Sequence, residues 1–338
     1  MNDAMSAEQR SSLLTLINGC WTTQAIAAAA TLGVPALLAE SPKSAASLAA
    51  ATRSHEPSLL RLMRGLTSLG LCHQREDGRF ELTPLGARLD PDASDSLDAW
   101  ARMRVLRWAE WSDLSESVRT GECHQKRRAG NDDFSRLADS PDARLFHEAM
   151  VRLTRRVAAG VAEVVTFNGD ETLVDVGGGS GEMLAALMAL HPSMSGIVLD
   201  LEHARAGAEE HLGRAGLGGR CEFVSGSFFD ALPDAGDVYV LKSVLHNWDD
   251  ERASRILSRC RAVMKDGTRL LVVERLLPEQ WADSEQHRAC AASDLNMLVA
   301  LSGRERTEAE FRGLLGAASF TVVRVLSVGA EFYLIECR

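Results

Sequence analysis

Residues 173–182 read Leu173-Val-Asp-Val-Gly-Gly-Gly-Ser-Gly-Glu182, an apolar run that ends in a cluster of glycines. The apolar run favours a buried strand, and a segment with helical character begins at Glu182. Gly177, Gly179 and Gly181 let the chain turn tightly and leave no Cβ between the backbone and a ligand. This stretch therefore predicts the strand, turn and helix that open a parallel α/β sheet.

The rest of the C-terminal half continues this alternation of short β-rich runs and helical segments. Only residues 327–330 separate the last two runs, which leaves no room for a crossover helix, so these two strands should pair antiparallel. We predict a seven-stranded α/β sheet with helices on both faces and a terminal antiparallel hairpin. The expected strands are 172–176, 196–200, 221–224, 237–242, 268–274, 320–326 and 331–337, and the expected helices are 182–190, 204–215, 251–263 and 308–317.

The N-terminal part is predicted to be helical with one hairpin. Residues 8–40, broken near 33–35, are rich in Ala and Leu, and helices should follow at 44–51 and 57–70. An Asp-Gly step between the runs 71–75 and 79–83 is typical of a hairpin, which completes a winged-helix pattern. The helix at 57–70 should bury one face, made of Leu59, Leu62, Met63, Leu66 and Leu69.

The region that follows, residues 92–165, is expected to be mostly helical, with a polar break at 121–133. Lys126-Arg127-Arg128 within this break is interpreted as a solvated loop. These patterns divide the chain into a winged-helix part (1–95), a helical linker that contributes to the substrate pocket (96–165) and the sheet domain (166–338).

Composition narrows the class of protein. The 338 residues carry 37 Lys plus Arg against 47 Asp plus Glu, a formal charge of −10. Residues 1–100 hold eight basic against eleven acidic residues, so the winged helix lacks the basic face that a DNA-binding regulator needs. No apolar run approaches the ~20 residues of a membrane span, and residues 1–10 lack the apolar core of a secretion signal. We expect a cytoplasmic enzyme that binds neither nucleic acid nor membrane.

Two acids near the glycine turn bear on its ligand. Asp200 ends the second strand, where a carboxylate is well placed to accept hydrogen bonds from ribose hydroxyls. Asp175 precedes the turn, where it would repel a pyrophosphate but attract a cationic amino-acid group. Three interpretations compete: simple turn chemistry, a dinucleotide site, which usually has the spacing G-x-G-x-x-G, and an S-adenosylmethionine site. Charge favours S-adenosylmethionine, which carries a sulfonium and an ammonium group.

A histidine follows the fourth strand of the predicted sheet. His246, in Leu241-Lys-Ser-Val-Leu-His-Asn-Trp-Asp-Asp250, lies at the edge where open α/β sheets bind ligands. Glu274 ends the fifth strand at the same edge, and Glu305 lies in a loop before a later helix. A carboxylate on one ring nitrogen would orient the imidazole and raise its pKa. A base held in this way beside an electrophile is suited to deprotonating a hydroxyl.

The difference in pKa between a histidine and a phenol limits how the proton can be removed. A free histidine and a phenol differ by ~3.5 pKa units, or roughly 5 kcal/mol. Complete ionisation of the substrate before reaction would therefore consume much of the catalytic advantage. Proton removal coupled to methyl transfer, with the oxygen held in line with the methyl group, fits better.

The motifs V-D-V-G-G-G-x-G at 174–181 and H-x-W-x-D at 246–250, with residues 196–200 and 303–307, together resemble the O-methyltransferase family that includes plant caffeate-type enzymes. The chain looks closest to the bacterial members that modify polyketides, anthracyclines and related natural products. The similarity spans nearly the whole chain, including Leu82-Thr-Pro-Leu-Gly86.

This resemblance implies a Rossmann-like class I methyltransferase sheet, an N-terminal dimerisation domain, a homodimer, S-adenosylmethionine as methyl donor and no metal. His246 would be the proton acceptor, flanked by Glu274 and Glu305. Met150, Asn247 and Met297 would contact a small hydroxylated aromatic substrate, although both methionines would equally suit core packing. The implied cofactor contacts are Asp175, Gly177, Gly178, Gly179, Gly181, Asp200, Leu201, Ser227, Phe228, Lys242, Ser243 and Trp248.

The chain departs from the family pattern at one position. Where the family usually has Gly-Asp before the aromatic pair, this chain has Gly226-Ser227-Phe228-Phe229. Ser227 can still form a hydrogen bond, but an acidic contact near the adenine amino group is missing, so we expect modestly weaker cofactor binding. Relatives with the same fold methylate nitrogen or use the cofactor without methyl transfer, and His246 with its two acids favours O-methylation among these alternatives.

Overall fold

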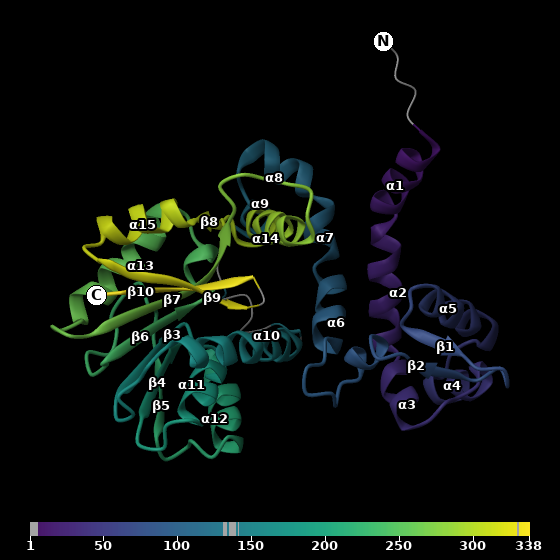
Figure 1. Cartoon of the computed structure of the whole chain (residues 1–338), viewed down its shortest axis with the longest axis horizontal. Coiled ribbons are helices and arrows are strands. Elements are labelled where there is room, and N and C mark those ends of the chain that lie inside the picture. The colour runs from purple at the N-terminus through teal and green to yellow at the C-terminus, as the bar shows by residue number, and fades with distance from the viewer. Residues whose placement is uncertain (1–5, 131–133, 135–139, 141, 330) are drawn as a thin grey trace, which may run out of the picture. The chain divides into compact units, whose positions relative to one another are not determined.

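The computed structural model describes residues 6–130, 134, 140, 142–329 and 331–338. The chain forms two compact units (Figure 1). The first comprises Met1–Trp108 and Arg144–Arg152, and the second comprises Ala109–Ala143 and Leu153–Arg338.

The second unit contains a mixed sheet whose long strands lie in the order β5-β4-β3-β6-β7-β10-β9. The first five pair in parallel, whereas β10 runs antiparallel to both β7 and β9. This confirms the predicted α/β sheet and its terminal hairpin; β8, a two-residue strand beside β7, is an addition. The strands are β3 Thr172–Val176, β4 Ser195–Asp200, β5 Cys221–Ser225, β6 Val238–Lys242, β7 Arg269–Leu277, β8 Arg306–Thr307, β9 Val322–Gly329 and β10 Phe332–Cys337.

Helices cover both faces of this sheet (Figure 1). Apolar residues of α11, α12 and the C-terminal half of α10 pack on one face around Leu173 and Val240. Residues of α13 and α15 pack on the other face around Val174 and Leu241. Strand alternation thus gives a two-sided core, as expected for parallel strands. The helices are α8 Leu114–Thr120, α9 His124–Ala129, α10 Ala143–Val164, α11 Glu182–Met188, η3 Glu202–Ala204, α12 Arg205–Arg214, η4 Leu245–Asn247, α13 Asp250–Val263, α14 Glu285–Leu301 and α15 Glu308–Ala317.

Helix α14 was absent from the predicted elements although it is 17 residues long. Polar residues are spread along its first three turns, so the sequence shows no clear apolar stripe there. Its buried apolar residues concentrate at the C-terminal end, where Met297, Val299 and Leu301 lie. Tertiary packing of that end, more than helical periodicity, accounts for the element.

The first unit has the predicted helices and hairpin. Its core gathers Leu48 and Met63 from the helices and Phe80 from the hairpin. Gly33 adopts a φ of 72° and separates α2 from α3, which confirms the expected break. Leu69 is 36% exposed because the helix ends at Ser68, so its placement on the buried face was wrong. The elements are α1 Ala7–Ile17, α2 Gly19–Thr31, α3 Val34–Glu40, α4 Ala45–Thr52, α5 Glu56–Ser68, β1 Cys72–Gln74, β2 Phe80–Leu82, η1 Gly86–Leu89 and α6 Asp98–Leu106, with α7 Trp108–Ser112 at the border of the two units.

The basic triplet at 126–128 is not a solvated loop, which corrects the sequence interpretation. It lies in α9, and the Arg127 guanidinium is largely buried against the Asp113 carboxylate and the Ser117 hydroxyl. The hydrogen-bonding partners were distant in sequence and so were invisible to a local charge pattern. Residues 131–133 of the predicted polar break lie outside the described part of the chain.

No single helix within the described residues has both the length and the apolar character to cross a membrane. The pair α2 and α3, bent by 60°, meets those two criteria only when taken together.

Candidate active site

The glycine turn joins β3 to α11 with three residues at positive φ, namely Gly177 (73°), Gly179 (58°) and Gly181 (76°). A Cβ on Gly177 would lie 3.1 Å from Val244 and 3.3 Å from Phe228, and one on Gly178 would lie 2.6 Å from the Asp175 carboxyl. Side chains are therefore disfavoured by both conformation and space. The missing Cβ atoms of Gly177 and Gly178 make room for side chains of the protein itself, whereas a Cβ on Gly179 would meet no described atom within 4 Å.

Asp200 closes this turn from the end of β4. Its Oδ2 accepts a hydrogen bond from the Gly179 N–H (2.7 Å), and its Oδ1 accepts one from the Leu201 N–H (2.6 Å). These bonds orient the carboxylate beside the turn. The arrangement ties two predicted cofactor positions, Asp200 and Leu201, to the glycine turn.

Asp175 and Lys242 lie on β3 and β6, which are neighbouring strands of the sheet. Burial, together with the nearby charge of Asp200, raises the pKa of Asp175 to about 7. Within the described ranges, Oδ2 of Asp175 is buried without a hydrogen-bond partner. Loss of solvent lowers the pKa of Lys242 to about 8, and its Nζ donates to Thr154 Oγ1 (3.1 Å). An unsatisfied buried carboxylate beside the glycine turn suits a cationic ligand.

Aromatic side chains stand on the other side of Gly177. Trp248 is buried and packs edge-to-face against Phe229, with ring centroids 4.9 Å apart, and against Phe228 at 6.1 Å. Ser227 precedes this pair, and its Oγ accepts a hydrogen bond from the Phe229 N–H. The structure thus gathers Ser227, Phe228 and Trp248, three predicted cofactor positions, beside the turn.

His246 lies in η4, immediately after β6, and Glu274 of β7 holds this turn in place. The Glu274 Oε1 accepts hydrogen bonds from the N–H groups of Val244 (2.9 Å), Leu245 (2.8 Å) and His246 (3.4 Å). Its Oε2 lies 3.6 Å from Nδ1 of the imidazole. Glu274 is fully buried, so it acts as a negatively polarised cap for the turn as well as a neighbour of the ring.

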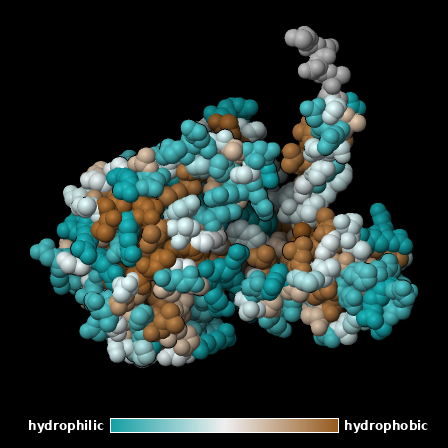
Figure 2. Space-filling model, viewed as in Figure 1, coloured by the Kyte–Doolittle hydropathy of each residue, from teal (hydrophilic) through white to brown (hydrophobic). Residues whose placement is uncertain are grey.

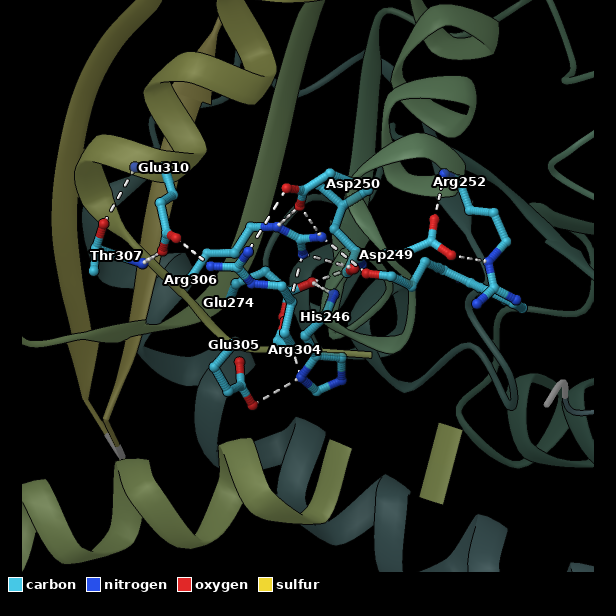
Figure 3. Close-up of polar contacts among 12 residues, drawn as sticks. His246, Asp249, Asp250, Arg252, Glu274, Arg304, Glu305, Arg306, Thr307 and Glu310 are labelled. Atoms are coloured by element: carbon cyan, nitrogen blue, oxygen red, sulfur yellow. Dashed lines mark hydrogen bonds and ion pairs between the residues drawn. The ribbon is translucent and has the colours of Figure 1, made fainter. Parts of the chain in front are cut away.

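Glu305 makes the direct contact with the imidazole (Figure 3). Its Oε1 lies 3.0 Å from Nδ1 of His246 and accepts a hydrogen bond from Ser293 Oγ (2.7 Å). The Glu305 N–H in turn donates to Oδ1 of Asp294 (2.9 Å). Both Ser293 and Asp294 lie on α14, the helix absent from the sequence prediction, so these supports were missed with it. Among the described residues, Nε2 of His246 has no partner, which leaves it available to a ligand.

Electrostatics polarise this cluster. Burial by itself lowers the pKa of His246, but Glu274 and Glu305 outweigh it and the pKa is raised. Burial raises the pKa of Glu274, whereas His246 and Ser293 hold the pKa of Glu305 below its usual value despite burial. Glu305 is therefore the ionised partner of the ring. The cluster favours a proton on the imidazole, the property of a base strengthened by its surroundings.

The remaining predicted site residues do not all lie in the same unit of the chain. Ser243 has a φ of 55°, and its carbonyl accepts a hydrogen bond from Nδ2 of Asn247 (2.9 Å), so both residues shape the segment around His246. Met297 is buried in α14 of the second unit. Met150 belongs to the first unit and packs with Ala99 and Met103. The structure therefore does not bring the two methionines together within one unit.

Ligand atoms of His246, Glu274 and Glu305 lie within 4.8 Å of one another, close enough to surround a metal ion. However, Glu274 Oε1 already accepts the turn amides, and Glu305 Oε1 already pairs with both Nδ1 and a hydroxyl. The second oxygens, Glu274 Oε2 and Glu305 Oε2, are buried without a hydrogen-bond partner among the described residues, so a proton on the imidazole is held mainly through Oε1 of Glu305.

The fold and the site define a class I S-adenosylmethionine-dependent methyltransferase. Residues 111–321 match the model of the O-methyltransferase domain, and residues 14–90 match the O-methyltransferase dimerisation domain. The chain therefore belongs to the O-methyltransferase family, as its sequence resemblance predicted.

Two curated relatives illustrate this kinship. The chain is 41% identical to O-demethylpuromycin-O-methyltransferase of Streptomyces alboniger, over 93% of this chain and 84% of the relative. It is 34% identical to 8-amino-8-demethylriboflavin N,N-dimethyltransferase of Streptomyces davaonensis, over 92% of this chain and 90% of the relative. The family matches identify an S-adenosylmethionine-dependent O-methyltransferase, while the second relative carries an N-methylating name.

Solved structures of two relatives superpose on nearly the whole of this chain. LaPhzM superposes with a TM-score of 0.91 at 38% identity, covering 97% of this chain and 98% of that one. Human N-acetylserotonin methyltransferase in complex with S-adenosylmethionine gives a TM-score of 0.87 at 28% identity, covering 100% and 99%. Use of S-adenosylmethionine, in place of a dinucleotide, follows from the family and from these neighbours.

Proposed function

We propose that this protein transfers a methyl group from S-adenosylmethionine to a phenolic hydroxyl of a small aromatic natural product, with His246 as general base. The proposal rests on the different surroundings of the two imidazole nitrogens. Nδ1 is held by Glu305 at 3.0 Å, and Nε2 has no partner in the described part of the chain. A base oriented at one nitrogen and free at the other can receive a substrate proton.

The residues around the glycine turn fit the cofactor. The unpartnered Oδ2 of Asp175 suits an ammonium group, and Asp200 suits ribose hydroxyls. The turn is open at Gly179, where a Cβ would meet no atom of the described residues within 4 Å. Phe228 offers a partly exposed apolar ring backed by the buried Trp248, and Ser227 offers a hydrogen-bonding hydroxyl. We assign the contacts from Gly179, Gly181, Leu201, Lys242 and Ser243 to the same ligand.

When bound, S-adenosylmethionine supplies an electrophilic methyl group on a sulfonium. His246 Nε2 accepts the proton of the substrate hydroxyl as the oxygen forms its bond to the methyl carbon, and the electron pair of the broken carbon–sulfur bond remains on sulfur. Glu305 stabilises the imidazolium that forms, and Glu274 holds the turn through its hydrogen bonds to the backbone amides. The buried setting strengthens both interactions relative to water. The protonated ring then returns its proton to solvent.

The substrate is assigned to the neighbourhood of Asn247 and Met297 in the second unit. Met297 is apolar and adaptable, which suits an aromatic ring. The first relative named above is an O-methyltransferase of O-demethylpuromycin, and we propose an aromatic hydroxylated substrate for this chain as well.

N-methylation is the second candidate, favoured by the riboflavin-type relative. An arylamine is far more nucleophilic than a neutral phenol and needs less help from a base. The pair of buried acids on His246 is more useful to a hydroxyl substrate, which is why O-methylation is preferred.

We further propose a homodimer built through residues 1–95, with 96–165 forming a linker and pocket region and 166–338 forming the catalytic domain. The match to a dimerisation domain supports this. Helix α1 supports it independently, because it has no buried residue within one chain. Leu13, Leu14, Leu16 and Ile17 are exposed on it, and Figure 2 shows apolar residues along this helix.

The test is intact-mass detection of methyl transfer from S-adenosylmethionine to matched aromatic phenols and anilines, using the full-length protein. We expect methylated phenols from the wild type. We expect at least a ~100-fold loss of turnover in His246→Ala with cofactor binding retained. His73→Ala, an exposed histidine of β1, is the matched control. Full activity in His246→Ala would overturn the base role, and methylation confined to anilines would replace O-methylation with the second candidate.

A further inference from the structure

We propose that Arg306 is a positioning residue for His246: its buried guanidinium grips the backbone on both sides of the histidine and so keeps the imidazole against Glu305. This inference rests on the proposed role of His246 as base. Arg306 makes no contact with the imidazole itself, so it would act through the turn that carries the ring.

Arg306 binds the backbone on both sides of His246 by hydrogen bonds. Nη1 of Arg306 donates to the Leu245 carbonyl at 3.0 Å, and Nη2 donates to the Trp248 carbonyl at 2.8 Å. These two residues bracket His246 and Asn247. Arg306 is only 1% exposed and is the largest fully buried side chain among the described residues. A guanidinium committed to two carbonyls in such a place fixes the path of the chain between them.

A third contact anchors the guanidinium from the next helix. Nε of Arg306 donates to Oδ1 of Asp250 at 2.9 Å, and Nη2 lies 2.8 Å from the same oxygen. Asp250 is the first residue of α13, where the helix dipole favours a carboxylate. The Asp250 side chain is largely exposed, so it pairs with the buried Arg306 guanidinium without losing its own contact with solvent.

The backbone on either side of Arg306 is joined to the histidine turn as well. The Arg304 N–H donates to the His246 carbonyl at 2.9 Å. A Cβ on Gly303 would lie 2.2 Å from that same carbonyl oxygen, so only glycine allows the two segments to approach this closely. Glu305 lies between Arg304 and Arg306. The segment that supplies the carboxylate is therefore the one that holds the histidine turn.

This arrangement explains why an arginine is suited to the position. Within the turn the Leu245 carbonyl accepts the Trp248 N–H at 3.2 Å, and Arg306 adds a second donor to it. The Trp248 carbonyl, which follows the turn, accepts from Arg306 as well. A planar guanidinium offers several N–H groups at fixed angles and can serve two carbonyls and a carboxylate at once, whereas a lysine ammonium is a single point of charge. With lysine here, we expect the turn to loosen and the contact between His246 and Glu305 to lengthen.

The test compares Arg306→Lys and Arg306→Ala with Arg312→Met, an exposed arginine of α15 paired with Glu308. For Arg306→Lys we expect S-adenosylmethionine affinity within about twofold of wild type by titration calorimetry and kcat lowered at least ~10-fold. We also expect the acid limb of the kcat profile to move to lower pH, because a loosened Glu305 raises the pKa of His246 less. Guanidinium added to Arg306→Ala should restore part of kcat, and Arg312→Met should behave as wild type.

An unchanged kcat in folded Arg306→Lys would overturn the proposal. So would a lowered kcat with the wild-type pH profile, because that pattern marks a general loss of structure. Should both Arg306 variants fail to fold, Asp250→Asn decides: a smaller shift of the acid limb in the same direction supports positioning, and no shift rejects it. Activity that survives in His246→Ala would instead refute the base role. Failure of the proposed function is therefore distinguished from failure of the positioning role, which the Arg306 variants test.

Discussion

Nδ1 of His246 lies 3.0 Å from Oε1 of Glu305, although the two residues are 59 positions apart in the chain. Sheet topology brings them together, since His246 follows β6 and Glu305 precedes β8, a strand that pairs with the end of β7. Both side chains are buried, so the contact is an electrostatic interaction in a medium where screening is weak. The pH dependence of the enzyme should report it.

The first prediction concerns Glu305→Gln. The pKa of His246 is raised, and the ring acts as a base only when neutral, so kcat should fall as pH drops through that raised pKa. Removing one carboxylate makes the pKa fall, so the acid limb should move to lower pH. The plateau should drop about 10- to 100-fold, because the imidazolium loses its partner. The measurement is kcat against pH, with Glu308→Gln as control; an acid limb unmoved from wild type would contradict the pairing.

The second prediction concerns Asp175→Asn. Burial raises the pKa of Asp175 to about 7, so its ionised form destabilises the ligand-free fold as pH rises from the ordinary pKa of an aspartate through 7. We expect the amide variant to have a higher Tm than wild type at pH 8 without ligand. It should bind S-adenosylmethionine about 10-fold more weakly, because the cationic group loses its counter-charge. Thermal unfolding and calorimetry at pH 6 and 8 check both; equal affinity would remove Asp175 from the site.

Most of the sheet and the glycine turn were predictable from the sequence, because their signals are local. Strand bounds agreed within a few residues, and the two acids beside His246 were placed at the correct edge of the sheet. The supports from α14 were not predictable. Ser293 and Asp294 act through contacts with a loop that the pattern could not position, and Arg306 reaches carbonyls some 60 residues away in sequence. Such partners depend on the completed fold.

The third prediction addresses the family departure at Ser227. Its Oγ accepts the Phe229 N–H, a role that an aspartate side chain can also fill. Ser227→Asp should therefore keep the turn and add a charged acceptor for the adenine amino group. We expect S-adenosylmethionine affinity to increase about three- to tenfold by titration calorimetry. Ser227→Asn, with the same shape and no charge, is the control; unchanged or weaker binding in the aspartate variant would refute the assignment.

The fourth prediction is that catalysis needs no metal ion. His246, Glu274 and Glu305 are close enough to ligate one, yet Glu274 Oε1 already accepts the turn amides and Glu305 Oε1 already pairs with Nδ1, which leaves one unpartnered oxygen on each carboxylate among the described residues. Prolonged dialysis against EDTA should leave kcat unchanged, and added zinc should inhibit by competing for the imidazole. A loss of activity that divalent metal restores would show that the three side chains form a metal site.

The last prediction concerns the dimer. Helix α1 is only 11 residues long and has no residue buried within its own chain, although an isolated helix of that length is marginal in water. Leu13, Leu16 and Ile17 are exposed on this helix, and Trp21, in the next helix, is 68% exposed. A second copy of the chain would bury these apolar side chains. Burying each large apolar side chain contributes ~1.5–3 kcal/mol, so Leu13→Glu with Leu16→Glu should weaken the dimer at least ~100-fold. Light scattering across a concentration series measures this, with Leu190→Glu, an exposed leucine of the second unit, as control. A monomeric wild type, or a double variant that dimerises as tightly as the control, would show that α1 is not the interface.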